Sequence, residues 1–294
     1  MTNRRLCIFG EVLFDHFADG ARVLGGAPFN VAWHLQAFGQ APHFVSRVGN
    51  DPEGGSIRAA MADWGMDTSG LQTDPAHPTG RVEVRFVDGE PTYDIVHPCA
   101  YDAIEPLPGS AGCNLLYHGS LGLREPRSRH TLQQLLDCNP ATVFVDVNLR
   151  PPWWQREQVL NMLRTAHWVK LNTDELARLS GSGPGDAPSP TEFLDRHQLK
   201  GLLLTHGARG AELFTAAGDH FTVQPDTDIE VMDTVGAGDA FASVMILGLA
   251  NEWPLDLTLQ RAQTFASRIV GNRGATVSDA TFYQSFAKQW GLGA

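Results

Sequence analysis

The sequence predicts an α/β fold in which a central, mostly parallel sheet is flanked by helices, with a small separate β-sheet beside it. Short apolar runs alternate with segments of helical periodicity along most of the 294 residues, which is typical of parallel strands joined by helices. Residues 79–100 depart from this pattern, because polar and apolar residues alternate there as in a hairpin with one wet face. A chain of this length can bury the core of one large domain, which we expect to span residues 1–294.

The first elements establish the alternation of strand and helix. Residues 6–10 form an apolar run that ends at a glycine, as a buried strand does. Residues 29–38 have helical periodicity up to Gly39, a typical helix stop. Residues 43–48 predict a second strand, and residues 53–64 predict a second helix.

The hairpin segment follows. Residues 81–87 alternate in polarity, Asp88 and Gly89 predict a turn, and residues 92–96 predict the returning strand. The exposed apolar positions of this ribbon would need a partner, either the closed site or a second subunit.

Alternation resumes in the C-terminal half. The strands expected there are 114–117, 142–147, 168–171 and 201–205, and the helices are 128–137, 155–165, 173–179, 190–197 and 240–250. The glycine-rich stretch 181–186 lacks the Lys-Ser/Thr ending of a phosphate loop, so we interpret it as a linker.

Composition excludes several classes of protein. A net charge of −11 argues against nucleic-acid binding, which usually needs a basic face. No segment is long and apolar enough for a membrane span or a signal peptide, so we expect a cytoplasmic protein. The four cysteines are widely spaced and the histidines lack zinc-ligand spacing, which predicts reduced, mostly buried thiols and no zinc site.

The most informative stretch is Asp233-Thr234-Val235-Gly236-Ala237-Gly238-Asp239, which runs directly into an apolar helix. A glycine-rich turn at a helix start presents free N–H groups and the positive end of the helix dipole, and both attract phosphate oxygens. An acid at the same helix start suits phosphoryl transfer to a hydroxyl, because the carboxylate accepts the hydroxyl proton. The alternative for Asp239 is a helix cap, which is compatible with catalysis.

Other polar residues follow the predicted strands. In open α/β sheets, ligands bind at the carboxyl ends of the strands. We therefore expect one crevice to collect Gly10, Glu11, Asp15, Asn148, Arg150, Asn172 and the stretch 205–207.

These motifs, in this order, resemble the ribokinase-like (PfkB) carbohydrate kinases over nearly the whole chain. The resemblance is carried by Gly10-Glu11 with Asp15, Gly25-Gly26-Ala27-Pro28-Phe29-Asn30, Asp146-Val147-Asn148-Leu149-Arg150, Asn172-Thr173-Asp174-Glu175, the segment 205–210 and the stretch 233–241. Within the family the chain is most similar to fructokinases, because of Gly-Gly-Ala-Pro-x-Asn at 25–30, His118-Gly119-Ser120, and Trp153 and Trp154 after Arg150.

The resemblance implies roles for individual residues. Asp239 would be the catalytic base, with an anion hole formed by Gly236, Ala237 and Gly238. The sugar would be bound by Asp15, Gly26, Asn30 and Arg150. Arg150 alone is equally consistent with a salt bridge that fixes the turn at residues 151–152.

The resemblance also implies sites for ATP and its ions. The nucleotide would be bound by Asn172, Glu175, Thr205, Gly207, Gly210 and Gly274, and Glu175 would hold Mg²⁺ through water. Asn172 and Glu175 also fit a simple capping box. Asp233 and Val235 resemble a monovalent-cation (K⁺) site, although Val235 replaces the threonine of many relatives, so that only a backbone contact would survive there.

We therefore expect an ATP-dependent sugar kinase that acts on a primary hydroxyl, with fructose as the first candidate. A lid formed by residues 11–24 and 79–100 would close over the sugar, and a homodimer would form through it. The alternatives are a kinase for ribose, a ketogluconate or a nucleoside such as an aminoimidazole riboside, and a non-catalytic sugar or nucleotide sensor. A dehydrogenase is disfavoured because no Gly-x-Gly-x-x-Gly turn follows the first strand.

Overall fold

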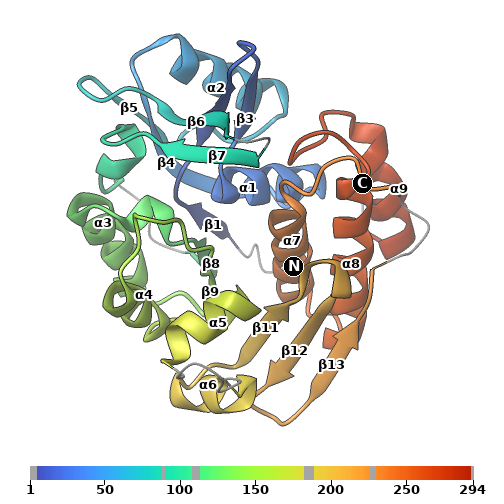
Figure 1. The fold of residues 1–294 in the computed structure, drawn as a ribbon. Coiled ribbons are helices and arrows are strands. Elements are labelled where there is room, and N and C mark those ends of the chain that lie inside the picture. Colours follow the sequence, from blue (N-terminus) through green and yellow to red (C-terminus); the bar gives the residue numbers. More distant parts are fainter. Residues whose placement is uncertain (1–4, 88–89, 108–112, 182–188, 226–229, 293–294) are drawn as a thin grey trace.

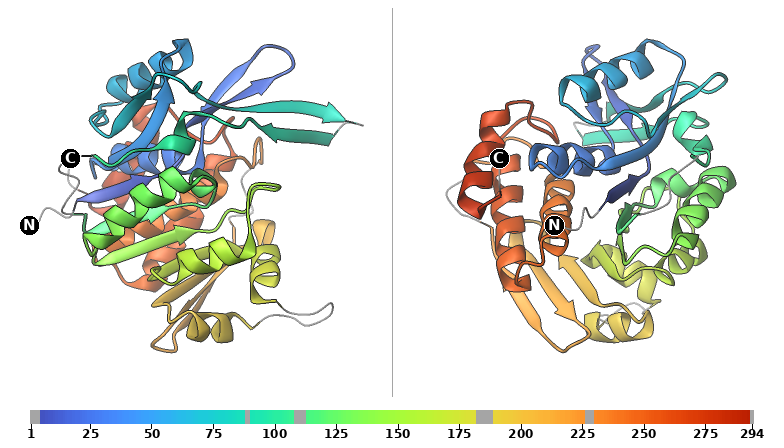
Figure 2. Two further views of the ribbon diagram at one scale, coloured as in Figure 1. Left: turned by 90° about the vertical axis from the view of Figure 1, so that its left-hand side faces the viewer. Right: turned by 180° about the vertical axis from the view of Figure 1, so that it is seen from behind.

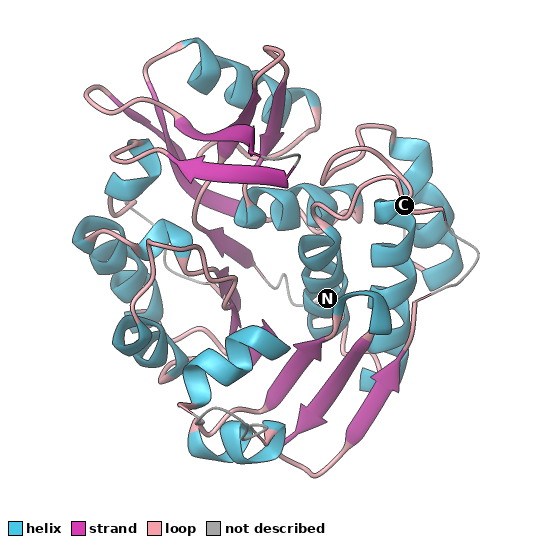
Figure 3. Cartoon of the chain, in the orientation of Figure 1, coloured by secondary structure: helices cyan, strands magenta, loops and turns pink. Residues whose placement is uncertain are grey.

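Strand β1 (Leu6–Phe9) lies inside the main sheet and is fully buried. Its first and third residues belong to one apolar cluster, and its second and fourth belong to another. Successive side chains of a strand point to opposite faces, so a strand that is apolar throughout must be covered on both faces. Figure 1 and Figure 3 show helices on both sides of this sheet.

The computed structural model describes residues 5–87, 90–107, 113–181, 189–225 and 230–292. Within these ranges a nine-stranded sheet has the order β13-β12-β11-β10-β9-β8-β1-β4-β5. Its other strands are β4 (His43–Gly49), β5 (Leu71–Asp74), β8 (Leu115–His118), β9 (Thr142–Asp146), β10 (Trp168–Asn172), β11 (Gly201–Thr205), β12 (Ala211–Thr215) and β13 (His220–Val223). The predicted turn at residues 88–89 and most of the predicted linker at 181–186 lie outside the described residues.

The sheet is mostly parallel, as the sequence predicts. Strands β1, β4, β5 and β8 to β11 pair in parallel, whereas β12 and β13 are antiparallel at one edge. The sequence analysis did not identify β5, β12 or β13. They are short strands with partly exposed side chains, β5 and β13 at the two edges of the sheet and β12 beside β13, so they lack the continuous apolar run that marks the inner parallel strands.

Helices follow the parallel strands. They are α1 (Ala27–Ala37), α2 (Pro52–Asp63), α3 (Pro126–Asp137), α4 (Arg156–Leu163), α5 (Thr173–Ser180), α6 (Pro190–Arg196), α7 (Ala237–Ala250), α8 (Leu255–Val270) and α9 (Ala280–Trp290), with short 3₁₀ helices η1 (Ala100–Ala103), η2 (Leu121–Leu123) and η3 (Gly207–Arg209). The first seven α-helices match predicted ones, and α8 and α9 were not anticipated. No helix in the described ranges combines the length and the apolar character needed to cross a bilayer.

A second sheet, the lid sheet, has the strand order β3-β2-β6-β7. Its strands are β2 (Leu13–Phe17), β3 (Arg22–Gly25), β6 (Gly80–Val87) and β7 (Glu90–Ile95). The expected single wet face is confirmed, because Val82, Val84 and Ile95 are buried on one face while Arg81, Arg85 and Asp94 are exposed on the other. Figure 2 shows the β6–β7 hairpin projecting away from the main sheet.

The prediction of reduced thiols is wrong for two of the four cysteines. Cys7 and Cys113 form a disulfide, with their Cα atoms 5.8 Å apart, a separation within the usual range for such a bond. They are 106 positions apart in sequence, and only the pairing of β1 with β8 brings them together. Cys99 and Cys138 are free thiols.

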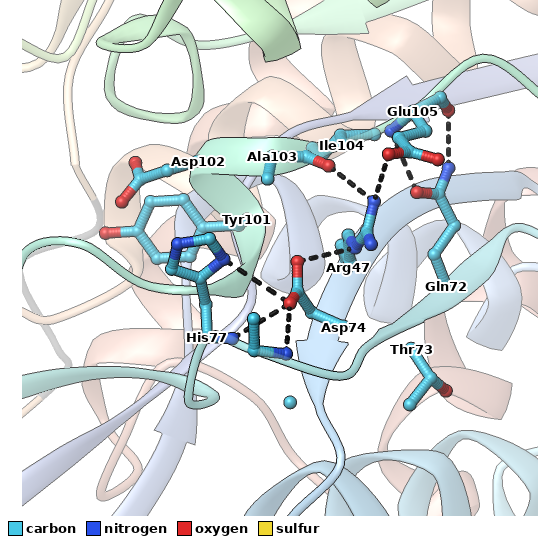
Figure 4. A network of polar contacts seen from close by, with 12 residues as sticks. Arg47, Gln72, Thr73, Asp74, His77, Tyr101, Asp102, Ala103, Ile104 and Glu105 are labelled. Atoms are coloured by element: carbon cyan, nitrogen blue, oxygen red, sulfur yellow. Dashed lines mark hydrogen bonds and ion pairs between the residues drawn. The ribbon is translucent and has the colours of Figure 1, made fainter.

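A buried polar network joins the edge of the main sheet to the segment that leaves the lid (Figure 4). On β4, Arg47 places its Nε 2.9 Å from Asp74 Oδ2 and donates from Nη1 to the carbonyl of Ala103 at 2.8 Å. Asp74 also accepts hydrogen bonds from the N–H groups of Ala76 and His77. The pair is almost fully buried, so the Asp74 carboxylate depends on Arg47 for compensation, while Arg47 Nη1 also lies 3.3 Å from the half-exposed Glu105.

We expect Arg47→Met to lower the free energy of unfolding by about 3 kcal/mol, because it leaves the Asp74 carboxylate buried without its cation. This is the lower end for breaking a buried pair, since two amides still bond Asp74. Urea unfolding at pH 7 measures the difference. The matched control is Arg22→Met, whose exposed contact with Glu53 should be worth less than about 1 kcal/mol. Equal losses in the two variants would contradict the structural role of Arg47.

Candidate active site

The carboxyl ends of the parallel strands carry most of the residues selected from the sequence. Glu11 follows β1 by two positions, Asn148 and Arg150 follow β9, and Asn172 and Thr205 are the last residues of β10 and β11. Parallel strands end at the same edge of a sheet. In the β10–β11 register Asn172 lies opposite Thr205. The predicted convergence on one edge is therefore confirmed for the strands that bear these residues.

The two glycine-rich motifs meet at this edge. Asn30 Nδ2 donates a hydrogen bond to Asp239 Oδ2 at 2.7 Å, across 209 positions of sequence. Asn30 lies in the first turns of α1 and Asp239 in the first turn of α7. A side chain from the start of α1 therefore holds the carboxylate at the start of α7. Nothing local links these helices, so this contact shows that the motifs form one site.

The start of α1 leaves no room for a side chain. Gly26 caps the helix with φ +107°, and a Cβ there would lie 2.8 Å from the carbonyl oxygen of Glu11. Its own carbonyl accepts the N–H of Asn30 at 2.8 Å. The glycine thus allows the end of β1 and the start of α1 to touch.

The loop before α7 is shaped by Gly236, which is left-handed at φ +79° and caps the helix. The N–H of Ala237 reaches the carbonyl of Thr234 at 3.4 Å, whereas the described residues offer no acceptor to the N–H groups of Gly238 and Asp239. Free amides at a helix start form an anion site. The N–H of Gly236 also has no acceptor among the described residues, so the predicted anion hole would have the N–H groups of Gly236, Gly238 and Asp239 as its free donors.

The residue Asp239 is partly exposed to solvent, but protein atoms surround its carboxyl group. Burial, and to a lesser extent the negative charge of Asp146, raises the pKa of Asp239 to about 6. The hydrogen bond from Asn30 and the charges of Lys170 and Arg150 lower it. The carboxyl is therefore mostly ionised at neutral pH and has a higher proton affinity than an exposed aspartate.

The positive charge of Arg150 acts on two further carboxylates, Glu11 and Asp15. Burial raises the pKa of Asp15 to about 6 and that of Glu11 to about 7, and the charge of Arg150 opposes the rise in both. The same guanidinium also lowers the pKa of Asp239. The Arg150 side chain is exposed and forms no ion pair with a described residue, so its charge acts on these three acids from beyond contact distance, which favours the site interpretation over a local salt bridge.

Glu175 has a structural part that the sequence analysis gave only as an alternative. Its Oε2 accepts the N–H of Asn172 at 2.8 Å, while Asn172 Oδ1 accepts the N–H of Glu175 at 2.9 Å, so the capping box is present. Its Oε1 accepts the N–H of Leu149 at 2.7 Å. Glu175 thus ties the loop that carries Arg150 to the end of β10. With both oxygens engaged by amides, a role toward Mg²⁺ through water stays a prediction.

The residues predicted for a monovalent cation do come together. Asp233 Oδ1 accepts the N–H of Val235 at 3.0 Å, and Asp233 Oδ2 accepts the N–H of Gly274 at 3.0 Å. Val235 contributes no side-chain oxygen, so carbonyl and carboxylate oxygens would have to supply the ligands. The described residues contain no cluster of three or more His, Cys, Asp or Glu side chains suited to a metal ion.

Gly207 and Gly210 lie on the turn between β11 and β12. That turn is held by the hydrogen bond from His206 N–H to the Gly210 carbonyl at 2.8 Å and by the contact of His206 Nε2 with Glu212 at 2.7 Å. These glycines follow Thr205 at the same edge of the sheet, but no contact joins them to Asp239 in the described structure. Their nucleotide role stays a prediction.

Two further charged residues, Lys170 and Asp146, lie at this edge. Lys170 Nζ lies 2.9 and 2.8 Å from the two oxygens of Asp146. The usable signal was a lysine inside the otherwise apolar run 168–171, since a buried charge needs a partner.

Comparison with known proteins adds a family to this geometry. The model described as "pfkB family carbohydrate kinase" matches residues 11–281. The chain is 31% identical to a fructokinase of Salmonella typhimurium, over 93% of this chain and 95% of that protein. It is 34% identical to a fructokinase of Klebsiella pneumoniae, over 84% and 85%. It is also 30% identical to an aminoimidazole riboside kinase of Salmonella typhimurium, over 78% and 75%.

Solved structures agree in fold. A fructokinase from Xylella fastidiosa with bound ATP superposes with a TM-score of 0.85 at 22% identity, covering 98% of this chain and 99% of that one. A double-mutant fructokinase from Vibrio cholerae O395, bound to fructose, ADP and potassium ion, superposes with a TM-score of 0.78 at 24% identity, covering 96% and 98%.

We expect Gly236→Ala to destabilise the fold by about 2 kcal/mol, because the new Cβ would lie 2.4 Å from the Cα and Cβ of Ala275 in addition to the strain of the positive φ. Gly20→Ala is the matched control, since Gly20 also has a positive φ (+88°) but open space around it, and should cost only about 1 kcal/mol. Chemical denaturation of both variants measures the difference. If the two cost the same, contact with the 274–275 loop does not constrain Gly236.

Proposed function

The chain belongs to the pfkB family of carbohydrate kinases, and from this premise we propose that it transfers the γ-phosphate of ATP to a primary hydroxyl of fructose. The observation that carries the proposal is the contact between Asn30 and Asp239 at the start of α7. It places a carboxylate with raised proton affinity beside the free amides of an anion site. A phosphoryl transfer to an alcohol needs both.

Asp239 acts as the base in this mechanism. Its carboxylate accepts the proton of the attacking hydroxyl as the oxygen–phosphorus bond forms, and the bond from the γ-phosphorus to the bridging oxygen breaks to release ADP. The amides of Gly238 and Asp239 bind the charge that gathers on the transferring phosphoryl oxygens. Asn30 holds the Asp239 carboxylate in one orientation through Oδ2, which leaves Oδ1 for the acceptor.

The sugar is held by side chains that approach from the lid and from two loops. Asp15 on β2 accepts hydrogen bonds from hydroxyl groups, and Asn30 can both donate and accept. Gly26 admits the sugar ring close to the backbone. Arg150 balances the negative charge that these carboxylates and the phosphoryl group bring together.

The nucleotide would bind beside the residues at the ends of β10 and β11 and beside the loop that precedes α7. Thr205, Gly207 and Gly210 border the nucleotide with Asn172, and Gly274 lies beside the loop that precedes α7. Glu175 would hold Mg²⁺ through water, and the ion would neutralise charge on the phosphates. The Asp233, Val235 and Gly274 arrangement supports a K⁺ ion behind the anion loop, as the potassium bound by the Vibrio fructokinase suggests.

The lid sheet covers the sugar side of the site. Asp15 belongs to it, and the Cβ position of Gly274 lies 3.9 Å from Val23 Cγ1 on β3, so the lid reaches the loop beside the anion site. Closure over the sugar would exclude water that competes for the phosphoryl group. The exposed Tyr93 on β7 supports a homodimer through the lid, which stays a proposal.

An aminoimidazole riboside is the second candidate acceptor, because a kinase of that substrate is 30% identical to the chain. Ribose and a ketogluconate remain further alternatives on the same fold. A non-catalytic sensor is disfavoured, since the base and the anion-hole glycines are all present. An ADP-release assay with fructose, ribose, ketogluconate and the riboside side by side tests the acceptor, and a higher kcat/KM for any acceptor other than fructose would overturn the fructose assignment.

We expect Asp239→Asn to lower kcat by a factor of about 10² to 10⁴ while the fold is retained, because the amide keeps the shape of the carboxylate but cannot take the proton. Steady-state ADP release with saturating acceptor measures the loss. Asp256→Asn is the control, since Asp256 is an exposed acid in the first turn of another helix, α8, and should retain wild-type turnover. Near wild-type turnover in Asp239→Asn would exclude Asp239 as the base.

We expect kcat/KM to fall about tenfold per pH unit below about pH 6, because the base must be ionised and burial raises the pKa of Asp239 to about 6. The sign follows from the role: protonation removes the acceptor for the hydroxyl proton, so activity is retained above this pKa and lost below it. Asp15→Asn should keep the acid limb while raising KM, which separates the two carboxylates. A limb centred near pH 7 would instead implicate Glu11, whose pKa burial raises to about 7.

A further inference from the structure

A buried ion pair lies beneath the anion loop, and the proposed mechanism gives it no part. Lys170 Nζ contacts Asp146 Oδ1 at 2.9 Å and Oδ2 at 2.8 Å. Lys170 is 8% exposed and Asp146 is 1% exposed. The two residues are register partners on β10 and β9, near the carboxyl ends of these strands. Inside a sheet whose neighbouring positions are apolar, such a pair costs desolvation energy, and well-packed apolar side chains would stabilise the sheet as well.

The ammonium group lies against the first turn of α7. A Cβ at Gly238 would be 3.2 Å from Lys170 Nζ and 3.8 Å from its Cε. Gly238 provides one of the free amides of the proposed anion site and directly precedes Asp239. Lys170 therefore lies close to the start of α7 that carries the base, and a side chain at position 238 would crowd the ammonium group.

Charges from every side of the site act on Asp239. Lys170 from β10 and Arg150 after β9 favour its ionised form, and Asp146 from β9 opposes it. Asn30 from α1 donates the hydrogen bond to it. The fields of Asp239 and Glu11 act on each other and on the buried hydroxyl of Tyr117 on β8. In this group Lys170 and Asp146 are the two charges of one pair and have opposite effects.

We propose that Lys170 and Asp146 are positioning residues for phosphoryl transfer: together they support the start of α7 and balance the field in which Asp239 takes up the proton. The inference rests on the proposed function of Asp239 as the base. In this arrangement Lys170 is held by Asp146 and acts through the helix start rather than as a ligand of the sugar. The pair keeps the net charge beside the base near zero, so that the base is ionised at neutral pH and still accepts a proton.

Opposite charges predict opposite changes in the pH profile. Lys170→Met removes the cation and leaves Asp146, so the acid limb of kcat/KM should move to higher pH. Asp146→Asn removes the anion and leaves the ammonium, so the limb should move to lower pH. Each displacement should be about one pH unit. The double variant Lys170→Met/Asp146→Asn should return the limb toward the wild-type position while kcat stays reduced, because the support beneath the loop is lost.

The experiment measures kcat/KM for ADP release between pH 5 and pH 9 for the wild type, both single variants and the double variant. Lys170→Arg keeps the charge and should leave the limb in place. If Lys170→Met fails to fold, Asp146→Asn and Lys170→Arg still decide the question. Limbs that stay in place, or move in the same direction, would overturn the proposal. So would Lys170→Met raising the KM for ATP tenfold or more with an unmoved limb, because Lys170 would then be a direct ligand of the phosphates.

A second readout does not depend on turnover. The ¹³C carboxyl signal of Asp239, assigned by its absence in Asp239→Asn, can be titrated in the same variants, and its midpoint should move as the acid limb does. If no acceptor supports ADP release by the wild type, the proposed function fails. The titration then still tests the effect of the pair on Asp239, and unmoved midpoints would overturn it independently.

Discussion

One hydrogen bond, from Asn30 to Asp239, holds together the site on which this protein depends. It joins the first turns of α1 and α7, which approach the same edge of the sheet from distant parts of the chain. Each helix starts at a glycine with positive φ, so each start comes close to its neighbours without a side chain between them. The bond therefore fixes the carboxylate beside free amides, which is the arrangement that a phosphoryl acceptor needs.

The electrostatics of the site follow from burial. Glu11 is buried and Asp15 and Asp239 are half-buried, so desolvation raises the pKa of each, and the charge of one guanidinium, Arg150, limits the rise for all three. Arg150 is itself held by its loop, because Glu175 accepts the N–H of the preceding residue, Leu149. The capping carboxylate of Glu175 on α5 thus fixes the loop that carries Arg150, the cation that lowers the pKa of the three site carboxyls.

Helices cover both faces of the main sheet, whereas the lid sheet has one face in water, because the strands of the two sheets differ in their pattern of apolar residues. Strands of the main sheet are apolar on both faces and require helices on each side. The lid strands alternate, so one face packs on buried residues such as Val82 and Ile95 while the other meets water. The network of Arg47, Asp74 and Ala103 ties the segment that leaves the lid to the edge of the main sheet, which gives the lid a fixed base.

The sequence by itself determined the fold class, the inner parallel strands and seven helices, because periodicity and glycine-rich turns are local signals, and it selected the candidate site residues, whose roles stay predictions. It did not determine β5, β12 and β13, whose partly exposed side chains give only a weak apolar pattern, or the disulfide between Cys7 and Cys113. The tertiary structure alone decided that Glu175 serves as a cap and a loop tie and that Lys170 is held by Asp146. The bond from Leu149 to Glu175 and the pair of Lys170 with Asp146 join residues 26 and 24 positions apart in sequence, and the energy of a buried charge depends on partners that only folding brings within reach.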